Sequence, residues 1–378
     1  MSLMRLPSIP KSRRVDPNLK IRVFLWAVFD LDYEFDPELL ARDPVHPRSS
    51  ARMLVYDRKR RELHHSQFLN LPEFLDSGTL LVVNQSKVLM ARFLAKKLTG
   101  AELEGLFLKV SEDSQSVWVW LKGRLDVGDS IKLLEGPFIQ VLEKKEKDTR
   151  LGISGEDFQK YLSEFGLVPL PPYIRKSRQN HGESETTSAD LDAYQSIWSQ
   201  ASNYGASVAA PTASLHFDEE LLTNLERKGI QRVSLDLFVG AGTFEPLTLE
   251  KWESKKLHEE KYLISEQTWK LIDEAKRANQ KIICVGTTTL RALESHSLLK
   301  EPGSHLNQIC STDLFVRSPF NFQIADGLIT NFHWPRSSLL ALVAAFVGES
   351  GKSWKDLYSQ ALAKQYRLFS YGDGMLIL

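Results

Sequence analysis

The segment KIICVGTTTLRALES, residues Lys281 to Ser295, passes directly from a strand pattern to a helix pattern. The short β-branched run Ile282–Val285 predicts a buried strand, and the spaced apolar residues after it predict a helix. Gly286 lies between the two, where the absence of a side chain lets the backbone turn sharply. A strand followed at once by a helix is typical of an α/β domain.

The same alternation extends to both sides of this segment. Residues 218–229 and 265–279 have the apolar spacing of amphipathic helices, and residues 231–239 have the composition of a strand. Residues 290–299 continue the helix that follows Gly286. The C-terminal half of the chain is therefore predicted to be a large α/β domain.

A different pattern occupies the region from Met53 to Ile153. It holds short runs of β-branched and aromatic residues separated by Gly, Asp and Ser, which is typical of a small antiparallel barrel. These runs are GTLLVVNQSKVLM (78–90), LEGLFLKV (103–110), SVWVWLKG (116–123), DSIKLL (129–134) and PFIQVLEK (137–144). After them, a helix ended by Gly166 and a proline segment lead out of the inserted domain.

The predicted organisation has four parts. Residues 1–20 form a flexible leader, and residues 56–165 form the inserted small β-barrel. Residues 21–55 and 166–378 form the large, discontinuous α/β domain. Polar residues 175–192 form a mobile surface loop with an exposed His181. The fold class is mixed α/β (α+β).

Composition excludes several classes of protein. The 378 residues include 48 basic and 48 acidic side chains, so the overall field does not favour nonspecific coating of nucleic acid. Only two cysteines are present, which permits no disulfide framework and favours a reducing, cytoplasmic location. The apolar run Val23–Phe29 lacks a cleavage site, and we expect a buried strand there rather than a signal core. No run approaches the ~20 apolar residues of a membrane helix.

Three stretches of small residues are candidates for ligand binding. SVAAPTASLHF, residues Ser207–Phe217, leaves room for a ligand beside the backbone. The turns after two predicted strands offer glycines and threonine hydroxyls, which favour an anionic group at a helix start, although tight packing is the alternative. Neither turn has a complete dinucleotide fingerprint or P-loop. The candidates are Ala210, Pro211, Thr212, Gly240, Gly242, Thr243, Gly286, Thr287 and Thr288.

His216, His258 and His333 are the candidate proton carriers, because imidazole titrates near neutral pH. The alternative for each is a histidine that satisfies hydrogen bonds in the core. Their spacing does not fit a zinc site, so no metal is predicted. The chain has no Gly-x-Ser-x-Gly sequence, which argues against serine hydrolase chemistry.

Taken in order, the motifs resemble the S-adenosylmethionine:tRNA ribosyltransferase-isomerase family of queuosine biosynthesis. The resemblance runs from about Asp30 to the C-terminus. It rests on FDLDYEFDPELLARDPVHPRSSARMLVYDR, PLPPYI, YQSIW, SVAAPTASLHF, VGAGTF, LHEEKY, VGTTTLRALES, TNFHWPRSSLLALVAAF and YRLFSYGDGML. It implies a large α/β domain with a barrel-like sheet, interrupted by a small β-barrel.

The resemblance also implies a reaction. The ribosyl part of S-adenosylmethionine would pass to 7-aminomethyl-7-deazaguanine at the wobble position of a tRNA, giving epoxyqueuosine with release of adenine and methionine. We expect no metal, no membrane partner and a monomer. His216, His333 and Glu260 would be catalytic, and Arg291 and Asn331 would join the small residues around the S-adenosylmethionine. The expected contacts to the tRNA or substrate are Arg48, Lys87, Arg92, His258, Arg336, Tyr371 and Asp373.

Five residues depart from the pattern of the family. Lys87 stands where arginine is usual, Phe238 replaces histidine and Ser214 replaces glycine. Trp334 replaces leucine, and Gly374 replaces alanine. A transferase with an altered acceptor, or a chain that binds tRNA without catalysis, are therefore the alternatives. His216 precedes a predicted helix start, so we expect a neutral imidazole inside the cofactor pocket rather than in the core.

Overall fold

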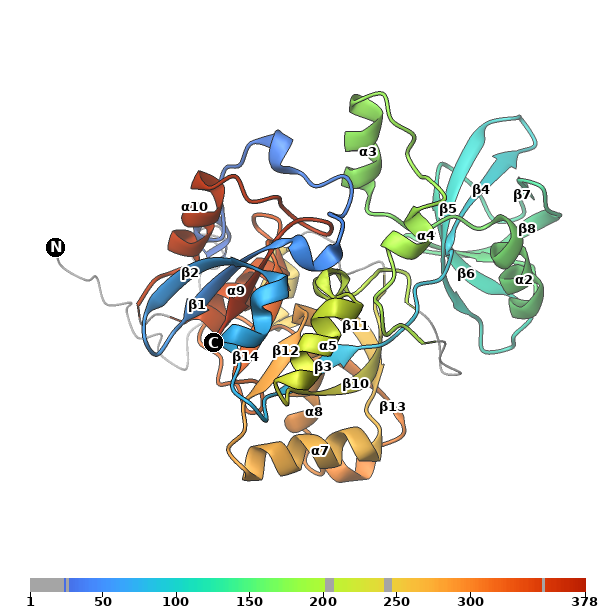
Figure 1. Ribbon diagram of the computed structural model, residues 1–378. Helices are drawn as coiled ribbons and strands as arrows, with labels where there is room; N and C mark the ends of the chain where they lie inside the picture. Colours follow the sequence, from blue (N-terminus) through green and yellow to red (C-terminus); the bar gives the residue numbers. More distant parts are fainter. Residues whose placement is uncertain (1–23, 25–26, 201–206, 241–246, 349–350) are drawn as a thin grey trace, which may run out of the picture.

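The computed structural model describes residues 24, 27–200, 207–240, 247–348 and 351–378. In this part of the chain a nine-stranded sheet with surrounding helices is joined to a closed six-stranded β-barrel. Figure 1 shows the barrel at one end of the molecule, with α3 (Pro172–Asn180) and α4 (Asp190–Ala193) between it and the large sheet. The mixed α/β class predicted from the sequence is confirmed.

The large sheet has the strand order β13-β11-β10-β3-β12-β14-β15-β1-β2. Its central strands β10, β3, β12 and β14 run parallel to their neighbours within this group, and β1 runs parallel to β15. All residues of β3, β12, β14 and β15 are buried, because core residues cover both faces of the sheet. The strand bounds are β1 Arg52–Asp57, β2 Glu62–Gln67, β3 Leu80–Asn84, β10 Gln231–Phe238, β11 Lys256–Leu263, β12 Ile282–Val285, β13 Ile309–Leu314, β14 Gly327–Asn331 and β15 Gly374–Ile377.

The helices predicted in the C-terminal half are present. α5 (Glu219–Arg227) and α7 (Glu266–Arg277) are capped by the side chains of Asp218 and Ser265, each of which accepts a hydrogen bond from a first-turn N–H. α8 (Thr287–Ser297) follows β12 directly at Gly286. Further helices are α6 (Leu249–Ser254), α9 (Ser338–Val347) and α10 (Trp354–Ala363). The alternation of strands and helices around Gly286 is therefore confirmed.

The barrel closes in the order β4-β5-β6-β9-β8-β7, with antiparallel neighbours throughout. Its interior is filled by alternating residues such as Phe93, Phe107 and Val119, against which Phe158 of α2 (Gly155–Phe165) packs. Gly166 ends α2, as predicted. The strands are β4 Arg92–Lys97, β5 Glu102–Val110, β6 Val117–Lys122, β7 Ser130–Leu133, β8 Phe138–Lys145 and β9 Asp148–Leu151.

One strand predicted for the barrel belongs instead to the large sheet, where β3 lies between β10 and β12. β2, which falls inside the range predicted for the barrel domain, also belongs to the large sheet and pairs with β1 at its edge. The barrel strands thus begin at Arg92 rather than near residue 56. The physical reason is that a short apolar run suits a buried parallel strand as well as a barrel strand, and only its partners decide between them.

The predicted mobile loop over residues 175–192 is helical at both ends and irregular between residues 181 and 189. α3 and α4 occupy both of its ends, and the 2% exposed side chain of Arg178 pairs with Asp190 at 2.8 Å. Arg178 also pairs with Asp43 at 2.6 Å, which ties the segment to the N-terminal part of the chain. His181 is exposed, as expected. Residues 27–30 are helical, so the strand expected over residues 23–29 is wrong for the residues described. Residues 1–20 lie outside the described residues.

None of the helices in the described ranges is both long enough and apolar enough to cross a membrane.

Candidate active site

A cavity of about 480 Å³ lies where four segments of the large unit meet. The small-residue wall Ala209–Ala213 forms one side, and the start of α8 forms another. The segment that follows β14 and the Pro171–Tyr173 segment complete the enclosure, together with two residues of the C-terminal turn. The lining residues are 171–173, 209–213, Val239, 286–288, 330–337, Leu339, Phe369 and Ser370.

The small-residue wall is held to the opposite side of the cavity by a chain of hydrogen bonds. The Thr212 hydroxyl donates to the Asn331 side-chain oxygen at 2.9 Å. The Asn331 amide then donates to the backbone oxygen of Phe369 at 3.0 Å. Ala210, Pro211, Thr212 and Asn331, which come from two separate motifs of the sequence, therefore lie around one cavity, and their role in binding a ligand stays a prediction.

The N-terminus of α8 supplies a positive end to the cavity. Gly286 has φ 101°, a left-handed conformation that favours glycine, and its N–H donates to the Ile329 oxygen at 2.8 Å. No side chain caps the helix, and Thr287 and Thr288 line the cavity. Uncapped N–H groups at a helix start attract anions such as a carboxylate.

Three aromatic side chains form another wall of the cavity. The Trp334 ring stacks on Phe369 with centroids 4.1 Å apart and planes 11° apart. Tyr173 meets both rings edge-on, at 5.4 Å and 5.5 Å. Such a wall suits a planar base or an organic cation. Tyr173 and Phe369 were not singled out from the sequence, although both lie in the motifs PLPPYI and YRLFSYGDGML.

His333 is the one imidazole among the described residues that line the cavity. Its ring Nε2 lies 2.8 Å from the Thr330 hydroxyl. Its backbone N–H donates to Tyr358 Oη at 2.9 Å, and its backbone carbonyl accepts from Tyr33 Oη at 2.7 Å. Burial lowers the pKa of His333 to about 3. The imidazole is therefore neutral near pH 7. No carboxylate occurs among the described lining residues, so His333 is the group there best able to take up a proton.

His216 lies behind the small-residue wall and does not line the cavity. Its Nδ1 is 3.0 Å from the Ala213 oxygen and its Nε2 is 2.9 Å from the Gly372 oxygen. The ring stacks on Phe68 at 4.0 Å, and its 4% exposure lowers the pKa of His216 by desolvation. The expectation of an imidazole inside the ligand pocket therefore does not match the geometry. His216 joins the wall to the C-terminal turn.

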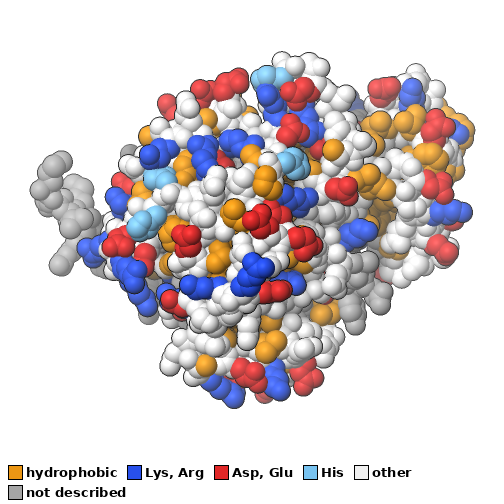
Figure 2. All heavy atoms as spheres, in the orientation of Figure 1, with side chains coloured by type: hydrophobic (Ala, Val, Ile, Leu, Met, Phe, Trp, Pro, Cys, Tyr) orange, Lys and Arg blue, Asp and Glu red, His pale blue; other side chains and the backbone are white. Residues whose placement is uncertain are grey.

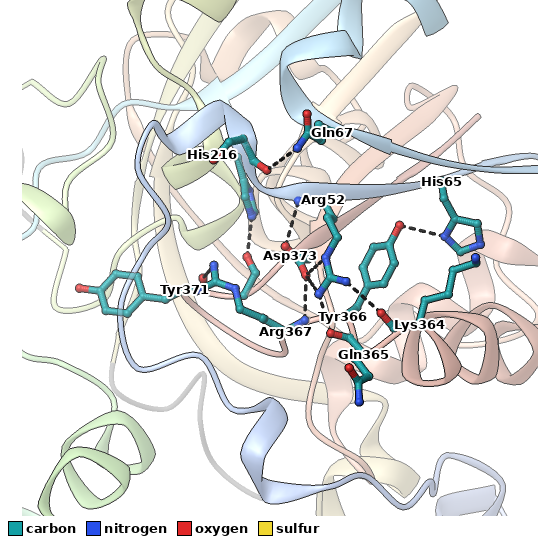
Figure 3. A network of polar contacts seen from close by, with 12 residues as sticks. Arg52, His65, Gln67, His216, Lys364, Gln365, Tyr366, Arg367, Tyr371 and Asp373 are labelled. Atoms are coloured by element: carbon teal, nitrogen blue, oxygen red, sulfur yellow. Dashed lines mark hydrogen bonds and ion pairs between the residues drawn. The ribbon is translucent and has the colours of Figure 1, made fainter. Parts of the chain in front are cut away.

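Asp373 organises that turn from a buried position. Its carboxylate accepts hydrogen bonds from the backbone N–H of Arg52 at 2.9 Å, from Arg52 Nε at 3.0 Å and from the N–H of Arg367 at 2.8 Å. Figure 3 shows Arg52 and Arg367 converging on Asp373, with His216 nearby. Tyr371 is also buried, and its hydroxyl has no hydrogen-bond partner in the described residues. Asp373 and Tyr371 are thus placed to shape the turn rather than to face solvent.

Glu260 and Arg291 form an ion pair away from the cavity. Glu260 lies on β11 and Arg291 on α8, and their exposures are 2% and 4%. Their side chains are joined through Arg291 Nη2 and a Glu260 carboxylate oxygen. Because the charges are paired and neither residue lines the cavity, the structure does not bring Glu260 or Arg291 to His333.

The other residues predicted to contact the tRNA or the substrate do not lie together at one site. Arg336 lines the cavity and pairs with Asp32. Arg48 donates to the Gln195 oxygen at 2.7 Å, and Arg92 contributes to a second cavity beside the barrel. Lys87 and His258 are exposed elsewhere, and Gly240 does not line the cavity. Gly242 and Thr243 lie outside the described residues. Figure 2 shows basic and acidic side chains interspersed on the face in view.

The five residues that depart from the family pattern lie in different environments. Trp334 belongs to the aromatic wall, and buried Ser214 has a hydroxyl with no hydrogen-bond partner in the described residues. A Cβ on Gly374 would lie 2.9 Å from the Thr330 oxygen and 2.9 Å from Phe68. Phe238 ends β10, and Lys87 is exposed.

Comparison with known proteins gives consistent matches. Residues 28–377 match a family described as queuosine biosynthesis protein. The chain is 38% identical over 354 residues to S-adenosylmethionine:tRNA ribosyltransferase-isomerase of Thermotoga maritima, covering 93% of this chain and 99% of that protein. It is 38% identical over 352 residues to the protein of the same name from Legionella pneumophila strain Lens, covering 92% and 99%. The crystal structure of S-adenosylmethionine tRNA ribosyltransferase from Thermotoga maritima matches with TM-score 0.51 and 31% identity, covering 92% and 100%.

Proposed function

Because the chain belongs to the family of queuosine biosynthesis proteins, we propose that it is an S-adenosylmethionine:tRNA ribosyltransferase-isomerase. It would transfer and isomerise the ribosyl part of S-adenosylmethionine. The acceptor would be the amine of 7-aminomethyl-7-deazaguanine at the wobble position of a tRNA. The products would be epoxyqueuosine-tRNA, adenine and methionine.

The observation that carries this proposal is one cavity that joins an uncapped helix start to an aromatic wall through a wall of small residues. The N–H groups of Thr287 and Thr288 suit the carboxylate of the methionyl part. The rings of Trp334 and Tyr173 suit the adenine or the positive sulfur. The backbone of Ala209–Ala213 leaves space for the ribose between them.

The positive sulfur of S-adenosylmethionine makes the adjoining ribose carbon more acidic. A base must then take the proton from that carbon, and the acceptor amine must be neutral to attack. His333 is neutral and lies in the cavity, so its imidazole is available as the proton acceptor. Its low pKa makes it a weak base, so the sulfur must supply most of the acidification. The hydroxyl of Thr330 would hold the ring in place through Nε2.

Two structural features keep water and misplaced groups away from the reacting atoms. The stacked rings of Trp334 and Phe369 would cover one wall of the cavity. The chain His216–Gly372–Asp373 holds the wall and the turn at a set separation. We therefore assign His216 and Asp373 as positioning residues.

The proposal is tested by incubating the protein with S-adenosylmethionine and a tRNA that carries the deazaguanine base. Mass spectrometry should detect adenine, methionine and the modified nucleoside. His333→Asn should lower kcat by about a hundredfold, because a general base is lost. The matched control His305→Asn alters an exposed histidine outside the cavity and should turn over at the wild-type rate.

Other outcomes would select the alternatives. Binding of tRNA without any release of adenine would indicate a protein that binds tRNA without catalysis. Release of adenine only with a different amine acceptor would indicate a transferase with an altered acceptor.

A further inference from the structure

A second cavity of about 410 Å³ lies between the outer face of the barrel and the Pro169–Pro172 segment. Pro171 and Pro172 line both this cavity and the candidate active site. These two prolines therefore form part of the wall of each cavity. None of the residues assigned above to binding or chemistry of S-adenosylmethionine lies in the second cavity, apart from this shared proline pair.

The barrel side of the cavity is built from one face of strand β6. Val117 and Val119 point into the barrel core and are fully buried. The intervening residues face outward, because side chains alternate along a strand. Trp120 and Lys122 are the outward residues that reach the cavity, opposite Leu106 and Glu104 of β5. The Trp120 indole N–H donates to Asp148 at 2.8 Å, which fixes the orientation of the ring.

The charges around the cavity are only partly balanced. Arg92 pairs with Glu104 at 2.8 Å and with Glu185 at 2.9 Å. Arg175 pairs with the same two carboxylates at 2.7 Å and 3.1 Å. The guanidinium groups hold the pKa of Glu104 below its usual value despite burial, and the carboxylates of Glu104 and Glu185 together pair with both arginines.

Two donors at residues that line the cavity have no partner in the described residues. Exposed Lys122 has no ion-pair partner in the described part of the chain. The Arg175 Nε–H is buried and has no hydrogen-bond partner in the same residues. The cavity thus presents a fixed aromatic ring, a proline wall and a positive rim. This combination suits a nucleobase with its phosphate, since single-stranded RNA is bound through stacking on aromatic rings and through backbone charge.

We propose that this second cavity binds a nucleotide of the tRNA next to the one that is modified. Its base would lie on Trp120, and its phosphate would lie near Lys122 and Arg175. The proposal rests on the proposed function, because it assumes that the acceptor base enters the first cavity. The shared Pro171–Pro172 segment would then separate two neighbouring bases that are splayed apart.

The test compares two tryptophans on the same strand face. Trp118 also points outward from β6, but it lies near Lys145 and Arg150 and does not line the cavity. The probe is a fluorescently labelled RNA hairpin with the sequence of the anticodon arm, titrated with the full-length protein. Trp120→Ala should weaken binding about tenfold or more through loss of stacking. Trp118→Ala should bind as the wild type does.

Two further variants separate a local effect from misfolding. Trp120→Phe keeps an aromatic face and should bind the hairpin within a few-fold of wild type. Lys122→Ala should weaken binding and reduce the dependence of log K on log[salt] by about one phosphate contact. Lys132→Ala is the control, since Lys132 is exposed on the barrel away from the cavity.

Equal hairpin affinity for Trp120→Ala, Trp118→Ala and wild type would overturn the assignment of the second cavity. If the wild type still forms the modified nucleoside in that case, only this assignment fails and the proposed function stands. Failure of the wild type to bind the hairpin and to modify tRNA would overturn both.

Discussion

Replacement of His216 by alanine separates a structural role from a chemical one. The variant removes a ring that contacts two backbone oxygens, at 3.0 Å and 2.9 Å, and stacks on Phe68 at 4.0 Å. Each lost hydrogen bond costs about 1 kcal/mol. The lost stacking costs about 1 kcal/mol more. Adding the cavity left behind, the free energy of unfolding should fall by about 4 kcal/mol.

A loss of this size should lower Tm by roughly 10 °C. Turnover measured well below Tm should stay within a few-fold of wild type, because the ring does not line the cavity that we propose as the active site. The assay pairs thermal unfolding with release of adenine. His258→Ala removes an exposed imidazole and is the control, expected to change Tm little. An unchanged Tm together with a hundredfold loss of turnover would refute this reasoning and place His216 in the chemistry.

Four further predictions concern acid stability, packing, a buried ion pair and tRNA binding. The pKa of His333 is about 3 in the folded protein and 6.5 in the unfolded chain. The contribution of His333 to the free energy of unfolding is therefore complete above pH 6.5 and is lost as pH falls below that value. From about pH 7 to about pH 5, thermal unfolding should show wild type losing about 2 kcal/mol more than His333→Asn; an equal loss would count against this. Gly374→Ala should destabilise by about 1–3 kcal/mol in denaturant unfolding because of the 2.9 Å approach to Thr330, whereas Gly303→Ala, which has open space, should be neutral. Asp190→Ala should cost about 2–4 kcal/mol in the same measurement, because buried Arg178 keeps only exposed Asp43 as a carboxylate partner. The exposed pair made by Asp313 should tolerate Asp313→Ala within about 1 kcal/mol. Affinity for tRNA should fall as salt rises, and salt-independent binding in a titration would argue against phosphate contacts.

The sequence alone predicts those parts of the structure that depend on contacts between residues close together in the chain. The strand, the glycine and the helix around Gly286 are adjacent in the chain, so their order predicts the turn that bounds the cavity. The wall Ala209–Ala213 was predicted for the same reason, since small side chains leave space wherever the backbone runs.

The sequence alone does not predict those parts of the structure that depend on contacts between segments far apart in the chain. The apolar pattern of β3 does not reveal that its neighbours are β10 and β12. The aromatic wall joins Tyr173, Trp334 and Phe369, which lie in three separate motifs. The sequence shows that His216 precedes a helix start. It does not show that the Nε2 of His216 contacts the carbonyl oxygen of Gly372, which lies near the C-terminus.

The buried pair of Arg178 and Asp190 shows the same limit for polar segments. Charged composition favours a solvated loop, yet the two side chains satisfy each other at 2.8 Å and allow α3 and α4 to pack. The composition of a segment shows how many charged side chains would have to lose water on burial. It does not show which oppositely charged residue would pair with each of them.

The origin of the atoms added to the tRNA tests the central claim most directly. The protein is incubated with tRNA bearing the deazaguanine base and with S-adenosylmethionine carrying carbon-13 in either its ribosyl or its methyl carbons. Mass spectrometry of the nucleosides should show the ribosyl label in the modified base, one adenine released for each label transferred and no methyl label. Transfer of the methyl label, or adenine release without labelled nucleoside, would contradict the account.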